Sequence, residues 1–63
     1  MNEHIETLAN KSIYYWKWYQ LTGQVDNLAA AIDFMKDYRK LGGTNYPDEE
    51  RQMNDAVNSA NLR

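Results

Sequence analysis

Few side chains in this sequence could carry out acid–base or nucleophilic chemistry. His4 is the one histidine among 63 residues, and there is no cysteine. A general base must lie within hydrogen-bond reach of the proton it removes, and no recognisable motif pairs His4 with a nucleophile. Asp33 and Asp37 could share one helix face as an acid pair. Because Lys36 and Lys40 stand beside them, a solvated, charged face is the better interpretation, and we predict no catalytic residue.

The sequence also lacks the ligand sets of metal and cofactor sites. Structural zinc is held by four Cys or His side chains, and this chain offers a single histidine and no cysteine. Gly42 and Gly43 are not followed by the Lys-Ser/Thr pair of a phosphate-binding loop. We therefore expect no metal and no cofactor, and we interpret the protein as non-enzymatic.

The side chains best suited to binding are aromatic. Residues 13–19 read Ile-Tyr-Tyr-Trp-Lys-Trp-Tyr, which places most of the aromatic residues of the chain in one short stretch. Within it, Tyr14, Trp18 and Leu21 recur at spacings of four and three, so on a helix they share one side. Tyr and Trp are the residue types most enriched at binding hot spots. We predict that these three residues form a contact surface, either between copies of the chain or with a partner protein.

A helix over residues 3–22 must position that surface. Its inner face is predicted by a repeat at helical spacing that comprises Ile5, Leu8, Ser12, Tyr15 and Tyr19. Asn2 is a candidate N-cap, and acidic residues follow it in the first turn, where they suit the helix dipole. A strand over 13–19 is the alternative, but consecutive aromatics at 14–16 break the alternation that a strand requires. Gly23 is expected to end the helix in the left-handed conformation.

The next segment, 24–41, carries the strongest helical pattern. Its apolar face is wide because it consists of two adjacent stripes. The first stripe comprises Val25, Leu28, Ile32 and Met35, and the second comprises Ala31, Phe34, Tyr38 and Leu41. We expect Leu28 and Phe34 to lie in the core. A turn of very few residues around Gly23 makes the two helices antiparallel neighbours, which is a helical hairpin.

A third, weaker helix is predicted over residues 47–61. Pro47 suits a first helical position and acidic residues follow it. Its apolar face holds only Met53, Ala56, Val57 and Ala60, and several Asn side chains compete with the backbone for hydrogen bonds. Whether this helix covers Tyr14 and Trp18 stays open at this point.

Size and charge narrow the remaining possibilities. A chain this short makes one domain, 1–63, and buries only roughly 60% of the surface that its unfolded form exposes. Without disulfides or metal, self-association is the remaining way to add stability, so we expect a homodimer. The net charge is −2, and the acidic excess lies in residues 44–63. The sequence therefore shows no cluster of basic residues of the kind that binds nucleic acid.

A helix-turn-helix around Leu21–Gln24 is the second interpretation that the pattern allows. It would make the protein a small DNA-binding transcriptional regulator, but Asp26, Asp33 and Asp37 on the second helix would repel phosphates. No apolar run approaches the roughly 18 residues of a membrane span, and no signal peptide is visible, so we expect a cytoplasmic protein. 

The sequence as a whole predicts an all-α fold: an antiparallel two-helix hairpin plus a shorter third helix, assembled as a homodimer. The favoured function is protein–protein binding by a regulator, inhibitor or assembly factor, of a type that phages or mobile elements encode. A DNA-binding regulator and a structural oligomeric subunit are the alternatives.

Overall fold

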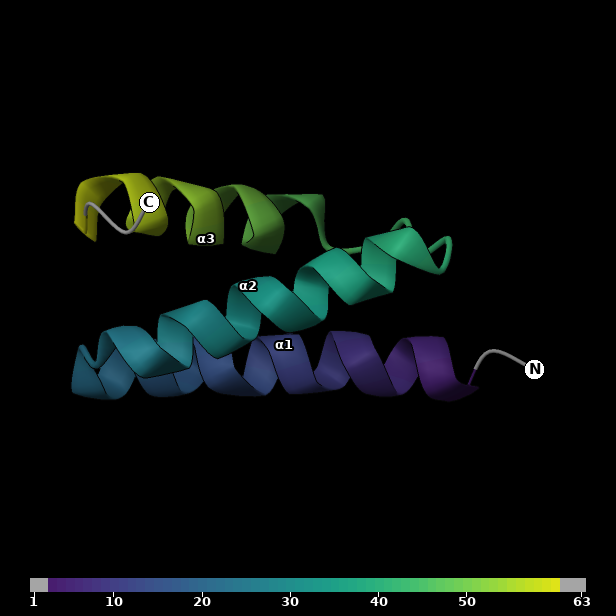
Figure 1. The fold of residues 1–63 in the computed structure, drawn as a ribbon, viewed down its shortest axis with the longest axis horizontal. Helices are drawn as coiled ribbons and strands as arrows, with labels where there is room; N and C mark the ends of the chain where they lie inside the picture. The colour runs from purple at the N-terminus through teal and green to yellow at the C-terminus, as the bar shows by residue number, and fades with distance from the viewer. Residues whose placement is uncertain (1–2, 61–63) are drawn as a thin grey trace.

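The computed structural model describes residues 3–60 and is all-α over that range. It contains three helices, α1 (Glu3–Thr22), α2 (Val25–Lys40) and α3 (Pro47–Ala60) (Figure 1). The predicted helices over 3–22, 24–41 and 47–61 are confirmed, with α2 shorter by one residue at each end. The candidate N-cap Asn2 and the predicted last helical residue, Asn61, lie outside the described residues.

The turn between α1 and α2 is built by Gly23 and Thr22. Gly23 has φ 72°, the left-handed conformation that glycine adopts most easily, and its N–H donates to the carbonyl oxygen of Tyr19 at 2.7 Å. The Thr22 hydroxyl donates to the carbonyl oxygen of Trp18 at 2.8 Å and accepts from the backbone N–H of Gln24 at 3.2 Å. The chain reverses within two residues, so α1 and α2 lie side by side and antiparallel (Figure 1). The predicted hairpin is confirmed.

Small side chains let α1 and α2 approach closely. Ala9, Ser12 and Ala31 are fully buried where the two helices meet. The Ser12 hydroxyl donates to the carbonyl oxygen of Ala31 at 2.7 Å, which satisfies a polar group that would otherwise be costly to bury. Leu28 and Met35 fill the neighbouring space and expose 0% and 1% of their surfaces.

Phe34 differs from its predicted place in the core, because it is only half buried. It lies at the edge of the hairpin, where its ring stacks on Tyr15 with centroids 5.7 Å apart and planes at 8°. The Lys11 ammonium lies over the same ring, 5.6 Å from its centroid. The wide apolar face of α2 therefore exceeds what α1 can cover, and its edge is completed by an aromatic pair and a lysine stem.

The loop between α2 and α3 is organised around Tyr38, which is 1% exposed. The Tyr38 hydroxyl accepts the backbone N–H of Asn45 at 3.0 Å, and the Gly43 N–H donates to the Tyr38 carbonyl oxygen at 2.9 Å. The Tyr46 ring packs on the Tyr38 ring with centroids 6.0 Å apart. Gly43 lies so close to the Tyr38 ring that a Cβ atom at this position would overlap with ring carbons.

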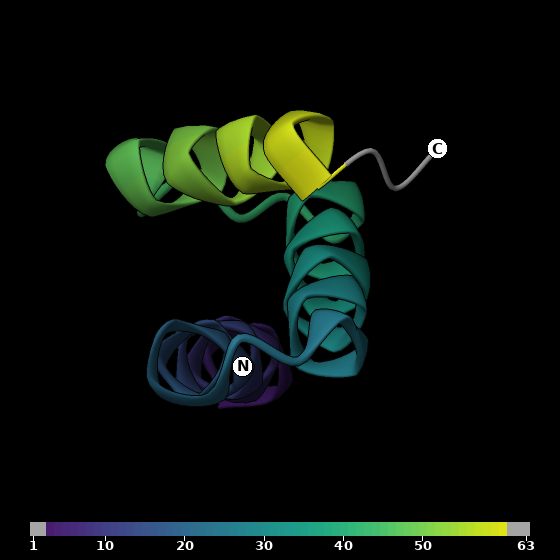
Figure 2. The ribbon, with the colours of Figure 1, turned by 90° about the vertical axis from the view of Figure 1, so that its left-hand side faces the viewer.

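α3 is attached to the hairpin by one apolar helix face and by one ion pair. Met53 is its fully buried side chain, and the Met53 sulfur lies 3.7 Å from the Ser12 hydroxyl oxygen. Arg39 of α2 donates from Nε to Glu50 of α3 at 2.9 Å and from Nη1 to the carbonyl oxygen of Gly43 at 3.0 Å. Figure 2 shows the ribbons of α1 and α3 apart, with α2 beside both, so the Met53 side chain reaches across to Ser12 of α1. 

We expect α3 to be the least stable helix in solution. It makes fewer contacts than the hairpin helices make with each other, and its half-buried apolar residues are small or peripheral. Amide hydrogen exchange should be fastest at the end of α3, in residues 58–60, and slowest around Ile32 in the middle of α2. Protection at Ser59 and Ala60 equal to that at Ile32 would contradict this expectation and would make α3 integral to the cooperative core.

Candidate protein-binding surface

Three large apolar side chains lie exposed on one side of α1. Tyr14 exposes 56% of its surface, Trp18 42% and Leu21 80%. We call Tyr14, Trp18 and Leu21 the α1 outer surface. These are the residues that the sequence spacing groups together, and the fold leaves all of them open to solvent.

The helical repeat explains why α2 leaves this surface uncovered. α2 packs on the side of α1 that carries Leu8, Ser12 and Trp16, all of which are buried. Two residues along a helix is a rotation of about 200°, so Trp16 and Trp18 point to opposite sides. Trp16 is 8% exposed, and its ring stacks on Tyr19 at 5.8 Å. α3 packs on α2 and leaves Trp18 exposed, so the third helix does not cover this surface.

Edge-to-face contacts hold the aromatic rings of the surface. The Tyr14 and Trp18 rings meet with centroids 6.3 Å apart and planes at 73°. Tyr14 also meets the Tyr15 ring at 5.2 Å and 82°. Tyr15 in turn stacks on Phe34 of α2. This chain of ring contacts connects the exposed surface with the edge of the hairpin and restricts the rotamers of Tyr14 and Trp18.

The end of the surface lies at the turn between the helices. Leu21 precedes Gly23 by two residues, and Val25, which is 43% exposed, follows it by two. Thr22 fixes this region because its hydroxyl also accepts the side-chain N–H of Asn27 at 3.2 Å. Apolar exposure therefore continues from α1 around the turn to the first residue of α2.

The charged residues of α1 that flank Tyr14 are both lysines. Lys11 and Lys17 are both exposed and lie three residues before and after Tyr14. Three residues along a helix is a rotation of about 300°, so the two lysines flank Tyr14 on opposite sides. The segment 7–25 contains no Asp or Glu. The α1 outer surface thus has basic flanks on a chain whose net charge is −2.

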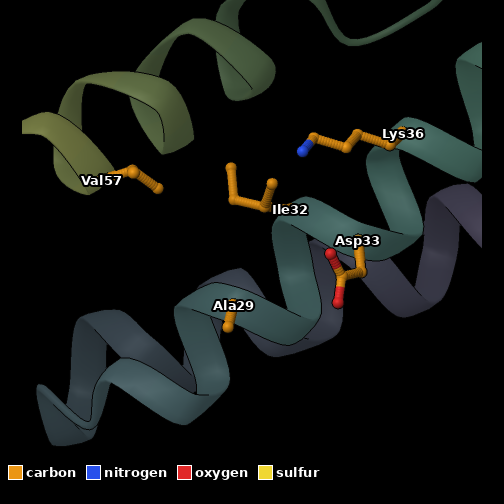
Figure 3. A pocket seen from close by; sticks show the side chains of 5 residues that line it. All are labelled: Ala29, Ile32, Asp33, Lys36 and Val57. Carbon is orange, nitrogen blue, oxygen red and sulfur yellow. The ribbon is translucent and has the colours of Figure 1, made fainter. Parts of the chain in front are cut away.

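A small cleft between α2 and α3 is a second concave feature, which the sequence spacing did not predict. It encloses about 180 Å³ and is lined by Ala29, Ile32, Asp33, Lys36 and Val57. Figure 3 shows Ile32 and Val57 pointing toward each other from the two helices. Ligand pockets usually span roughly 300–1,000 Å³ with convergent polar groups, so this cleft is small for a ligand site. No signal in the sequence could have located it, because it depends on where α3 docks.

The described residues contain no group of three or more His, Cys, Asp or Glu side chains placed to hold a metal ion. His4 is exposed in the first turn of α1, and Asp33 and Asp37 are exposed on α2. None of the helices within residues 3–60 is long and apolar enough to cross a membrane.

Comparison of this chain with protein-family models, with curated proteins and with solved structures finds no match. A functional proposal for this chain therefore rests on its own residues and their geometry.

Proposed function

We propose that this protein is a non-enzymatic protein-binding module that acts through the α1 outer surface. The observation that carries the proposal is the joint exposure of Tyr14, Trp18 and Leu21 on one side of α1. Soluble monomers rarely expose contiguous apolar patches larger than roughly a few hundred Å² unless the patch binds something. A regulator, an inhibitor or an assembly factor would each use such a surface.

The arrangement of the rings supports binding in a second way. Ordering flexible side chains costs free energy on association, and rings that are already held lose less. Tyr14 and Trp18 have few rotatable bonds and contact each other before any partner arrives. They are therefore suitable anchors for an interface, with Leu21 adding apolar area at one end.

Two other uses of the same fold stay predictions. As a structural subunit, the chain would pair its α1 outer surface with that of a second copy and form the homodimer that the sequence suggests. As a DNA-binding regulator, it would present α2 to phosphates. The second use has less support, because Asp26, Asp33 and Asp37 are all exposed on α2 and would repel the nucleic acid backbone.

The double change Tyr14→Ala with Trp18→Ala tests the proposal. We expect it to abolish association while far-UV helicity stays close to that of the unchanged protein, because both side chains are exposed. Association is measured by equilibrium sedimentation and by retention of a stoichiometric partner from the source cell. Leu41→Ala is the matched control, since Leu41 is 48% exposed beyond the far end of α2 and should leave association unchanged.

Further measurements distinguish a self-associating protein from one that binds a foreign partner or DNA. A homodimer should show a thermal midpoint that rises with concentration, because mass action stabilises the folded assembly. Retention on DNA that weakens steeply with salt would favour the regulator instead. If the double variant loses its helicity, or keeps every association of the unchanged protein, these residues are ordinary structural positions and the proposed function is wrong.

A further inference from the structure

We infer that the α1 outer surface binds an acidic amphipathic helix of another protein rather than a second copy of this chain. This inference rests on the proposed function and names the chemistry of the partner. It is carried by three features of the described residues: the charges that flank the surface, the area that the surface offers, and its shape.

The flanking charges are of one sign. Lys11 and Lys17 stand on opposite sides of Tyr14, and both are exposed. The carboxylates of α1 belong to its first turns, at Glu3 and Glu6, and none follows before Asp26. A partner that covers Tyr14 and Trp18 must therefore place its own flanking groups beside Lys17 on one side and beside Lys11, whose ammonium lies over the Phe34 ring, on the other. Complementary charge favours carboxylates at those positions and rejects basic partners.

A second copy of the chain would meet unfavourable charges at the same place. A two-fold symmetric interface brings the same patch of both copies together. Lys17 adjoins Trp18 near the middle of the surface, so an antiparallel pairing through its centre would bring the two Lys17 side chains toward each other. A parallel pairing would place Lys11 beside Lys11. Each arrangement sets like charges next to a desolvated patch.

The area of the surface also disfavours a stable dimer through this face alone. A standard interface buries roughly 800 Å² on each partner. A fully buried aromatic side chain contributes at most roughly 250 Å², and Tyr14, Trp18 and Leu21 are only 56%, 42% and 80% exposed. The three side chains fall short of that area by themselves. The stems of Lys11 and Lys17 can extend the interface, but only for a partner that accepts their charges.

The shape of the surface points to a helical partner. Tyr14, Trp18 and Leu21 recur at spacings of four and three and so form a row on one side of α1, along about two turns. A row of side chains on one helix packs well into the groove between rows on another helix. An amphipathic helix laid along α1 would set its apolar face on the row and its flanking carboxylates beside the two lysines, as charged residues flank the seam of a coiled coil.

The test is a calorimetric titration of the full chain with two matched helical peptides. Both carry leucines at coiled-coil a and d positions; one has glutamate at the flanking e and g positions and the other has lysine. We expect the glutamate peptide to bind about tenfold or more tightly than the lysine peptide at low salt, since reversing two flanking charges replaces two attractions by two repulsions. Added salt should reduce this difference.

Lys17→Glu is the diagnostic variant, because it reverses one flanking charge and leaves the apolar row intact. It should lower the affinity for the glutamate peptide severalfold and raise the affinity for the lysine peptide severalfold. Lys40→Glu is its control: it gives the same net charge, and Lys40 is exposed on the last turn of α2. It should leave both affinities unchanged. The double change Tyr14→Ala with Trp18→Ala should remove binding of both peptides.

The outcomes distinguish this inference from the proposed function. If both peptides bind with equal affinity and the Tyr14→Ala and Trp18→Ala variant binds neither, the inference of an acidic partner is wrong, but the proposed protein-binding surface is supported. If the unchanged protein is a dimer and the double variant is a monomer, the partner of this surface is a second copy of the chain and not a foreign helix. Binding of a single-stranded oligothymidylate in place of both peptides would assign the aromatic row and lysines to nucleic acid. If neither peptide binds and the variant changes no property, both the inference and the proposed function are wrong.

Discussion

Replacing Leu28 by alanine is expected to lower the free energy of unfolding by about 2–5 kcal/mol. Leu28 has no exposed surface and belongs to the hydrophobic core cluster of the three helices, so truncation leaves a cavity that the packed side chains around it cannot readily fill. A domain of 63 residues has a total stability of roughly 3–9 kcal/mol. The loss is therefore a large share of the whole, and thermal denaturation followed by circular dichroism should show a much lower midpoint.

Leu21→Ala is the matched control for this prediction. The substitution is chemically identical, but Leu21 is 80% exposed, so the free energy of unfolding of the monomer should change by less than about 0.5 kcal/mol. Phe34→Ala should fall between the two, because Phe34 is half buried and stacked on Tyr15. An unchanged midpoint for Leu28→Ala would refute the packing of α2 against α1.

Replacing Gly43 by alanine is the second change with a large expected effect. Its new methyl group would overlap with the ring of Tyr38, and Tyr38 is 1% exposed and cannot turn away into solvent. Overpacking of this kind costs about 1–3 kcal/mol. Displacing the ring would also break the hydrogen bond from the Asn45 N–H to the Tyr38 hydroxyl, which adds about 1 kcal/mol. Chemical denaturation would measure the loss.

A double-mutant cycle separates this steric effect from backbone strain. Gly42 has φ 100°, and nothing lies within 4 Å of a Cβ built on it, so Gly42→Ala reports conformational strain alone. Tyr38→Leu should cancel most of the cost of Gly43→Ala and none of the cost of Gly42→Ala, because only the first depends on the ring. Equal costs for Gly43→Ala in both backgrounds would contradict the contact between Gly43 and Tyr38.

The sequence by itself determined the features that depend on neighbouring residues. Helical periodicity and the glycines at 23 and 42–43 located α1, α2 and α3 to within about a residue where the structure describes them. The short turn at Gly23 required an antiparallel hairpin. The same periodicity grouped Tyr14, Trp18 and Leu21 on one side of α1, because residues three and four apart on a helix share a face whatever packs against it.

Only the tertiary structure decided which apolar faces are covered. The face of α2 is apolar on two stripes, and the sequence could not assign one stripe to α1 and the other to α3. In the structure both stripes contribute to the core: the Ala31 carbonyl oxygen accepts from Ser12 of α1, and Ile32 lines the cleft with Val57 of α3. Met53 and the Arg39–Glu50 ion pair attach α3 to the hairpin. Phe34 lies at an edge of the hairpin, and Trp18 is exposed. The physical reason is that burial depends on contacts between residues far apart in the chain, and local spacing carries no information about them.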